Sequence, residues 1–346
     1  MYLYWSTLAV LAWMFTQDWT DATKILYAKY KLTWRIPVSC EGSNVNLLKI
    51  CFVVNLATVN QRSIYQIMNS PRGLSLHIGV NMVDPQHYNN WDGALPACEN
   101  DADTMRDIAS LQGFETRQIK STEATRKAVR DAILDAAKEL SNGDFYLLTY
   151  SGHGGQVKDV DDEEADGVDD TWCLYDGQLL DDELNVLLAE FDEGVRVLVV
   201  TDSCHSGTML RGMEPDVENE NLIDDGFTIS RQMPGQVAVA TFRNNKTRYT
   251  DIQNALPKPR PEIKASVRLL SGCEEHEESF SSKLAGRFTT AIVNVFNNGA
   301  FEGDYEKFHA DIKEAVAKRR NPQTPAHMVI GVPSADFDAE TPFKIK

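Results

Sequence analysis

The sequence predicts an α/β fold in which a central, mostly parallel sheet is covered by helices on both faces. Short apolar runs recur after residue 70 and alternate with segments whose apolar residues are spaced as on a helix. The runs are continuously apolar, which is typical of parallel strands buried on both sides. With 346 residues, 42% of them hydrophobic, the chain can also bury a sizeable core.

The expected elements alternate along the chain. Strands are expected at 74–80, 116–119, 145–150, 196–201, 266–270 and 328–332. Helices are expected at 97–111, 125–140, 182–191, 288–297 and 305–318. The helix at 125–140 has its apolar residues on one face, with Ser121 or Thr122 available to cap its start and Asn142-Gly143 to end it. Asp182 is the expected cap of the helix that follows it in the sequence.

Residues 1–70 differ in composition from the rest of the chain. They hold six basic and three acidic residues and four of the six tryptophans. We therefore expect an accessory segment of unknown role at 1–70 and one domain at 71–346. The apolar stretch 2–16 is shorter than the roughly 20 residues a membrane-spanning helix needs, so a membrane is not expected as a partner. Export or membrane attachment stays open, but six cysteines without a CxxC pair favour a reducing compartment and a cytoplasmic location.

The charge of the chain argues against one class of function. There are 51 acidic and 34 basic residues, a formal net charge of −17. A surface that binds nucleic acid needs clustered Lys and Arg, so no nucleic-acid partner is expected. An acidic protein attracts cations, either metal ions or basic peptide segments.

Two glycine-flanked motifs follow two of the best predicted strands. YSGHGG places His153 after the strand at 145–150, and DSCHSG places Cys204 after the strand at 196–201. Sites in parallel sheets form at the carboxyl ends of the strands, so these side chains should lie close together. A nearby imidazole can accept the proton of a thiol and create a nucleophile that attacks a carbonyl. His205 is the less favoured alternative base.

These motifs resemble those of the metacaspases, which are caspase-like cysteine peptidases. The likeness covers about residues 74–346. It implies a caspase-like α/β/α sandwich and a monomeric endopeptidase without an organic cofactor, in which Cys204 is the nucleophile and His153 assists proton transfer. The main-chain N–H groups of Gly154 and Cys204 would form the oxyanion hole. The implied regions are a large-subunit-like part at 71–211, a processing or surface loop at 212–262 and a small-subunit-like part at 263–346.

The resemblance also implies a pocket for the P1 side chain of a substrate. The stretch LPACEND resembles the family's GCxND, so the expected pocket residues are Cys98, Asp101, Ser151 and Asp202. Two converging carboxylates repel each other unless a cation lies between them, and Arg or Lys supplies that cation. We therefore expect cleavage of proteins or peptides after Arg or Lys and not after Asp. The alternatives are a helix N-terminal charge for Asp101 and a turn residue for Asp202.

The acidic run at 159–170 allows two interpretations. Its eight carboxylates in twelve residues are usual for a solvated loop, but they also suit calcium, without the spacing of an EF-hand. By resemblance to calcium-activated metacaspases, the expected ligands are Asp169, Asp181 and Asp182. Arg211 stands where the family has a further ligand.

The segment 212–261 is expected to be a long irregular loop, either cut by the enzyme itself or left as a mobile surface loop. It holds six basic residues at which self-cleavage can occur: Arg231, Arg243, Lys246, Arg248, Lys258 and Arg260. Two other classes of function stay open at this point. They are a catalytically silent caspase-like scaffold or adaptor, and a calcium-responsive binding module that uses the acidic run alone.

Overall fold

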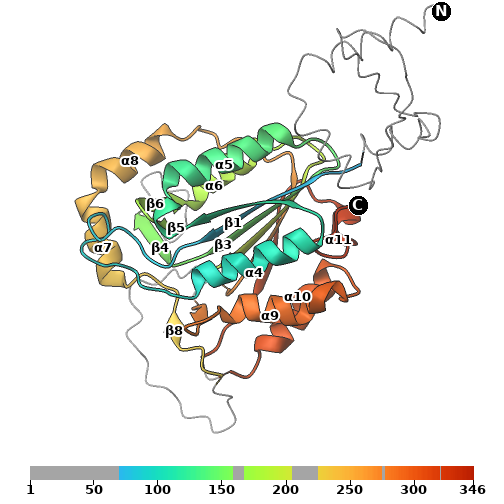
Figure 1. Ribbon diagram of the computed structural model, residues 1–346. Coiled ribbons are helices and arrows are strands. Elements are labelled where there is room, and N and C mark those ends of the chain that lie inside the picture. The colour runs from blue at the N-terminus through green and yellow to red at the C-terminus, as the bar shows by residue number, and fades with distance from the viewer. Residues whose placement is uncertain (1–69, 159–166, 205–224, 275–276, 320) are drawn as a thin grey trace, which may run out of the picture. The chain divides into compact units, whose positions relative to one another are not determined.

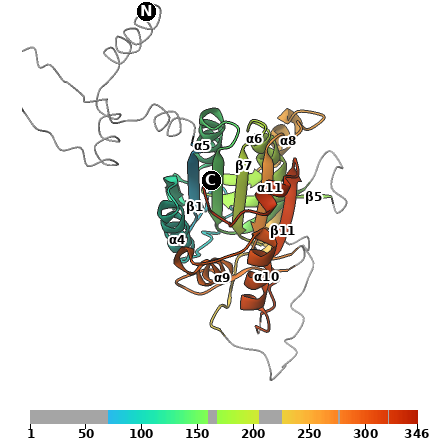
Figure 2. The same ribbon diagram turned by 90° about the vertical axis from the view of Figure 1, so that its right-hand side faces the viewer.

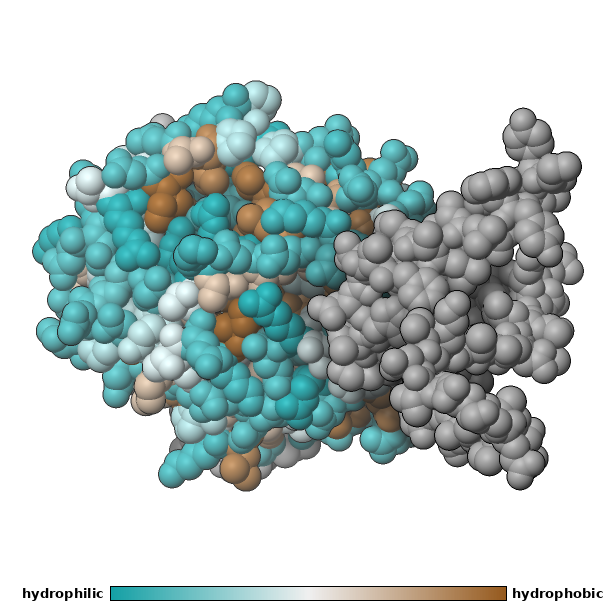
Figure 3. Space-filling model, turned by 45° about the horizontal axis from the view of Figure 1, so that its top comes forward, coloured by the Kyte–Doolittle hydropathy of each residue, from teal (hydrophilic) through white to brown (hydrophobic). Residues whose placement is uncertain are grey.

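A computed structural model of the chain describes residues 70–158, 167–204, 225–274, 277–319 and 321–346. All but one residue of the accessory segment expected at 1–70 lie outside these ranges, so that prediction stays untested. No helix among the described residues is long and apolar enough to cross a membrane. The face shown in Figure 3 is mainly hydrophilic, with apolar residues in small, separate patches.

The core of the fold is a six-stranded sheet in the order β11-β9-β7-β3-β1-β2 (Figure 1). Figure 2 shows β1, β7 and β11 in that order across the sheet. All neighbouring pairs are parallel except β9 and β11. The strands are β1 Gly73–Gly79, β2 Glu115–Lys120, β3 Phe145–Ser151, β7 Arg196–Asp202, β9 Ser266–Ser271 and β11 Ala326–Gly331. The predicted mostly parallel sheet is thereby confirmed.

Helices cover both faces of this sheet, which explains why its central strands β3 and β7 are mainly apolar and buried along their whole length. Alternate residues of β3 and β7, such as Leu148 and Val199, pack toward α5 and α6 in one hydrophobic cluster. Their neighbours, such as Leu147 and Leu198, belong to a second cluster with α4, α9 and α10. Figure 1 shows the two groups of helices on opposite sides of the sheet. The helices are α4 Cys98–Leu111, α5 Arg126–Glu139, α6 Asp181–Leu188, α9 Arg287–Phe296 and α10 Tyr305–Val316.

The predicted caps of two helices are wrong. Ser121 and Thr122 lie in a short 3-10 turn, and the cap of α5 is Thr125, whose Oγ1 accepts a hydrogen bond from the Ala128 N–H at 3.2 Å. Helix α6 already begins at Asp181, one residue before the predicted cap Asp182. Thr125 has an extended backbone and directly precedes the helix, so its side chain can accept a hydrogen bond from an N–H group of the first turn. Ser121 and Thr122 lie five and four residues before the first residue of the helix.

Several elements were not predicted. The segment expected to be irregular at 212–261 contains two helices, whose buried faces include the polar side chains of Thr241, Tyr249 and Gln253 and so lack a clear apolar period. A small antiparallel sheet also follows His153. The unpredicted elements are β4 Gly154–Lys158, β5 Val168–Leu174, β6 Gly177–Leu180, β8 Ile229–Ser230, α7 Gly235–Asn244, α8 Lys246–Ala255, β10 Phe280–Ser281 and α11 Ala335–Asp338.

Candidate active site

The sheet brings the His and Cys motifs to the same edge. Strands β3 and β7 pair in parallel up to Ser151 and Asp202, so His153 and Cys204 each follow two residues beyond matched positions. The two turns touch through their main chains, because a Cβ placed on Gly154 would lie 1.8 Å from the Cys204 carbonyl oxygen. Only glycine allows this close approach. The ring of Trp91 packs against the His153 ring, with 4.8 Å between centroids.

Burial favours the neutral forms of both candidate catalytic groups. Burial lowers the pKa of His153 to about 4, with the positive charge of Arg231 acting in the same direction. Burial also raises the pKa of the Cys204 thiol well above its usual range, and the neighbouring Cys273 adds to this effect. Hydrogen bonding of the ring to the main chain of Arg231, Gly93 and Gln232 opposes this lowering of the His153 pKa. A neutral imidazole has one unprotonated ring nitrogen, which can accept a proton.

Ser279 fixes the position of the Cys204 thiol. The Ser279 N–H donates to Cys204 Sγ at 3.1 Å, and the Ser279 carbonyl oxygen lies 3.5 Å from the same sulfur. The Ser279 hydroxyl donates to Asp202 Oδ1 at 2.7 Å. Sequence reasoning missed this residue, because no motif surrounds it and it lies 75 residues from the cysteine it contacts.

The four residues expected to form the P1 pocket surround one guanidinium group of the same chain. Arg231 is wholly buried, with a side-chain exposure of 0%. Its Nη2 lies 2.6 Å from Asp101 Oδ2, and its Nε lies 3.5 Å from Asp202 Oδ1. Its Nη1 lies 2.6 Å from Ser151 Oγ and 3.9 Å from Cys98 Sγ. The structure thus brings all four predicted side chains together around a basic side chain.

Hydrogen bonds hold both carboxylates of the pocket in place. Asp101 Oδ1 accepts from the Gly286 N–H at 2.9 Å. Asp202 Oδ2 accepts from the N–H and the hydroxyl of Thr289 at 3.1 and 2.8 Å. Burial raises the pKa of Asp101, while the Arg231 guanidinium opposes this shift by stabilising the carboxylate. Asp101 also lies in the first turn of α4. The same carboxylate is therefore both a helix N-terminal charge and one of the residues around the Arg231 guanidinium.

Gly286 lies against Asp202 and the Arg231 guanidinium, a contact that the sequence did not indicate. A Cβ at this position would lie 2.1 Å from Asp202 Oδ2 and 2.5 Å from Arg231 Nη2. Any side chain here would therefore occupy the space that the guanidinium needs. The φ angle of Gly286 is −73°, so the reason for glycine is the space and not the backbone conformation.

The carboxylates expected to bind calcium are engaged by other groups. Asp182 is paired with Arg260, and Asp169 accepts a hydrogen bond from the Gln253 amide. Asp181 is partly buried, and this burial, followed by the charges of Asp170 and Asp169, raises its pKa well above the usual range. Among the described residues, no three His, Cys, Asp or Glu are arranged to hold a metal ion. Residues 159–166, which are most of the acidic run, and Arg211 lie outside the described residues, so the expectation of a calcium site stays untested.

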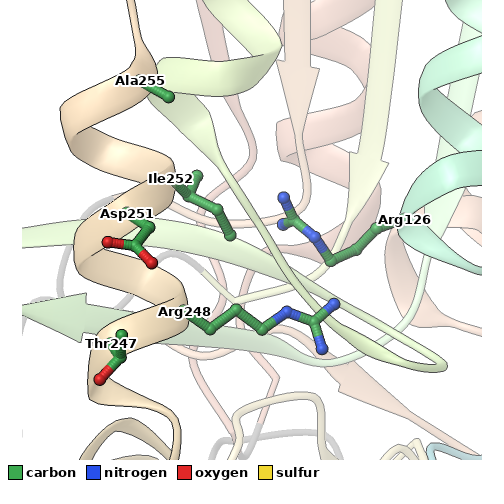
Figure 4. Close-up of a pocket in the computed structure, with 6 residues that line it drawn as sticks. All are labelled: Arg126, Thr247, Arg248, Asp251, Ile252 and Ala255. Atoms are coloured by element: carbon green, nitrogen blue, oxygen red, sulfur yellow. The ribbon is translucent and has the colours of Figure 1, made fainter.

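A hollow of about 680 Å³ lies elsewhere, between α8 and the start of α5. Figure 4 shows Arg126 and Arg248 extending into it from these two helices. Arg126 is bound to both carboxylate oxygens of the buried Glu183. The described lining contains no thiol or imidazole, so we do not assign the catalytic chemistry to this hollow.

Comparison with known proteins agrees with this geometry. The caspase domain family matches residues 78–331. Metacaspase-1 of Schizosaccharomyces pombe is 30% identical over 256 residues, which is 64% of this chain and 58% of that protein. Metacaspase-1 of Mycosarcoma maydis is 28% identical over 266 residues, which is 68% of this chain and 64% of that protein. The chain thus spans less than two thirds of the length of these curated relatives.

A solved structure supports the same assignment of the fold. The crystal structure of a protein from Geobacter sulfurreducens is 43% identical, with a TM-score of 0.69. The match covers 80% of this chain and 99% of that protein. It agrees with the mixed α/β architecture and with the family match over most of the described residues. The chain is a metacaspase-like member of the caspase domain family.

Proposed function

We propose that the chain is a cysteine endopeptidase that cleaves proteins or peptides after Arg or Lys. The observation that carries the proposal is the burial of Arg231 between Asp101 and Asp202, beside the Cys–His pair. A buried carboxylate is strongly stabilised by an opposite charge and destabilised by a like one. An Asp side chain in this pocket would leave three carboxylates close together, so cleavage after Asp is disfavoured.

The geometry favours Arg over Lys. Arg231 uses Nη1 for Ser151 and for the Asp202 carbonyl oxygen, at 2.6 and 2.7 Å, and Nη2 for Asp101. A lysine carries its charge on a single nitrogen and cannot make all of these contacts at once. We expect kcat/KM values to decrease in the order Arg, Lys, Asp.

In the proposed reaction, Cys204 Sγ attacks the carbonyl carbon of the P1 residue. His153 accepts the thiol proton and donates it to the departing amine, leaving a thioester that water hydrolyses. The developing negative charge on the carbonyl oxygen is stabilised by the Gly154 N–H, which already donates to the Arg231 carbonyl oxygen at 2.9 Å. We include self-processing in the proposal, because the residue in the pocket belongs to the same chain.

Peptides that differ only at P1 test this function. Wild type should cleave the Arg peptide fastest, and Cys204→Ala should cleave none of them. Cys173→Ala is the matched control, because it removes another buried free thiol, in β5, and should keep the activity. Wild type that turns over no peptide would instead support a silent scaffold, and faster cleavage after Asp would overturn the pocket assignment.

Calcium is left out of the proposed mechanism because Asp182 and Asp169 are already engaged by Arg260 and Gln253. We expect the rate on the Arg peptide to be the same with a chelator as with added calcium. A rate that rises with free calcium would support calcium activation. It would also imply that calcium displaces Arg260 and Gln253 from Asp182 and Asp169. Binding of calcium by an inactive Cys204→Ala variant would favour the binding-module alternative.

A further inference from the structure

One basic residue of the segment 212–261 differs from the others. Arg231 is fully buried in the pocket, whereas the other candidates lie on or after the unpredicted helices. Arg243, Lys246, Arg248 and Lys258 are exposed, and Arg260 is paired with Asp182. The structure therefore distinguishes among bonds that the sequence left equivalent.

The chain before Arg231 is held as an added strand. Residues 229–230 form β8, which pairs antiparallel with β10. The Arg231 N–H donates to the Ser279 carbonyl oxygen at 3.0 Å, and the Thr228 N–H donates to the Ser281 carbonyl oxygen at 3.1 Å. Main-chain pairing of this kind is a common way for an extended peptide to bind a protein edge.

The chain after Arg231 is held by the glycine turn that follows His153. The Gly154 N–H donates to the Arg231 carbonyl oxygen at 2.9 Å, and the Met233 N–H donates to the Gly154 carbonyl oxygen at 2.8 Å. Ser279 contacts the Cys204 sulfur through its N–H and the Arg231 N–H through its carbonyl oxygen. The bond between Arg231 and Gln232 is thus fixed on both sides, next to the nucleophile.

This segment also fills the space that a substrate would need. The cavity lined by Cys204, Gly154 and Met233 is only about 10 Å³, which is about the space of one water molecule. Met233 packs so closely on Gly155 that a Cβ there would lie 2.3 Å from its methyl carbon. The reactive residues His153 and Cys204 are only 6% and 3% exposed.

We propose that residues 228–233 are a substrate-like segment that blocks the active site, and that the first cut of the protein is its own Arg231–Gln232 bond. This rests on the proposed function. Cys204 Sγ bonds to the Arg231 carbonyl carbon as the bond to the Gln232 nitrogen breaks, and His153 transfers the thiol proton to that nitrogen. Water then hydrolyses the thioester, leaving an Arg231 carboxylate and a free thiol. The cut is intramolecular and frees the pocket for other substrates.

Intact-mass measurement and N-terminal sequencing of the full chain test the bond. Wild type should yield a fragment that begins at Gln232, and Cys204→Ala should stay whole. Arg231→Gln should stay whole at this bond, while Arg231→Lys keeps the charge and should be cut roughly tenfold or more slowly. Arg243→Gln, which changes an exposed residue of α7, should be cut like wild type.

Two kinetic measurements separate this inference from the proposed function and do not depend on the folding of a variant. The first-order rate constant of the cut should not change over a tenfold dilution. Turnover of an Arg peptide should begin after a lag that ends as the chain is cut. A first cut at another bond, a rate that rises with concentration, or immediate turnover by uncut protein would overturn the inference while leaving the proposed function intact. Wild type that cleaves neither itself nor any peptide would overturn both.

Discussion

Replacing Asp101 by Asn removes one negative charge from the proposed P1 pocket without changing its size. In the structure, Asp101 Oδ2 lies 2.6 Å from the bound guanidinium, and both groups are almost completely buried. The remaining carboxylate, Asp202, is farther from the guanidinium, with 3.5 Å between Oδ1 and Nε. The variant therefore binds a basic side chain with its closest counter-charge missing.

The size of the effect follows from the burial of the pair. Removing one partner of a buried ion pair costs about 3–5 kcal/mol, because the other charge stays buried and uncompensated. At about 1.4 kcal/mol per tenfold change in rate, this corresponds to a loss in kcat/KM of roughly 140- to 3700-fold for a P1 Arg substrate. A P1 citrulline substrate, which has the shape of Arg without its charge, should lose much less.

The assay is the ratio of kcat/KM for the Arg peptide to that for the citrulline peptide, which cancels changes in folding and in the amount of active enzyme. Asp103→Asn is the matched control on α4, since Asp103 is 39% exposed and its pairs with Lys120 and Arg106 lie at the surface. The control should change the ratio by less than about 1 kcal/mol, or roughly fivefold. An unchanged ratio in Asp101→Asn would show that Asp101 is uncharged in the pocket and would refute the reasoning.

Three further changes test the pocket, the core and the pH dependence. Gly286→Ala should place a methyl group against Asp202 and lower kcat/KM on the Arg peptide by about 1–3 kcal/mol, and an unchanged value would exclude Gly286 from the pocket wall. Glu183→Gln should lower the free energy of unfolding in urea by about 3–5 kcal/mol, because it leaves Arg126 buried without its counter-charge, and a loss below 1 kcal/mol would contradict this. Burial lowers the pKa of His77 to about 3, so the unfolded chain binds its proton more readily and stability should fall as pH falls from about 6.5 to 3. His77→Asn should make this decline shallower by up to about 1.4 kcal/mol per pH unit, and an unchanged slope would speak against the shift.

The sheet could be predicted because its signal is local. The central strands β3 and β7 are nearly continuous apolar runs, and matching their ends gives their register, which also brings His153 and Cys204 to one edge. The pocket residues Asp101 and Asp202 could be named because they belong to motifs near those ends. Their roles remain proposals, which the experiments above address.

The rest of the site could not be predicted because it depends on contacts between distant parts of the chain. Arg231 donates a hydrogen bond to Asp101, which lies 130 residues earlier in the sequence. The Gly286 N–H donates to the same carboxylate from 185 residues away. Nothing around Arg231 distinguishes it locally from the other five basic residues of its segment. The helices α7 and α8, which follow Arg231, bury polar side chains. Their sequences therefore lack the apolar period that would predict a helix.

The strand order has a consequence for the protein after the proposed cut. Strand β7 precedes Arg231 and β9 follows it, yet the two pair side by side in the middle of the sheet, from Arg196–Ser266 to Thr201–Ser271. Breaking the chain at residue 231 removes a covalent connection but none of these hydrogen bonds. The two pieces should therefore separate on a denaturing gel and yet elute together as one nicked, folded particle under native conditions. They should unfold in a single cooperative transition, since each piece lacks half of the hydrophobic core that the sheet organises.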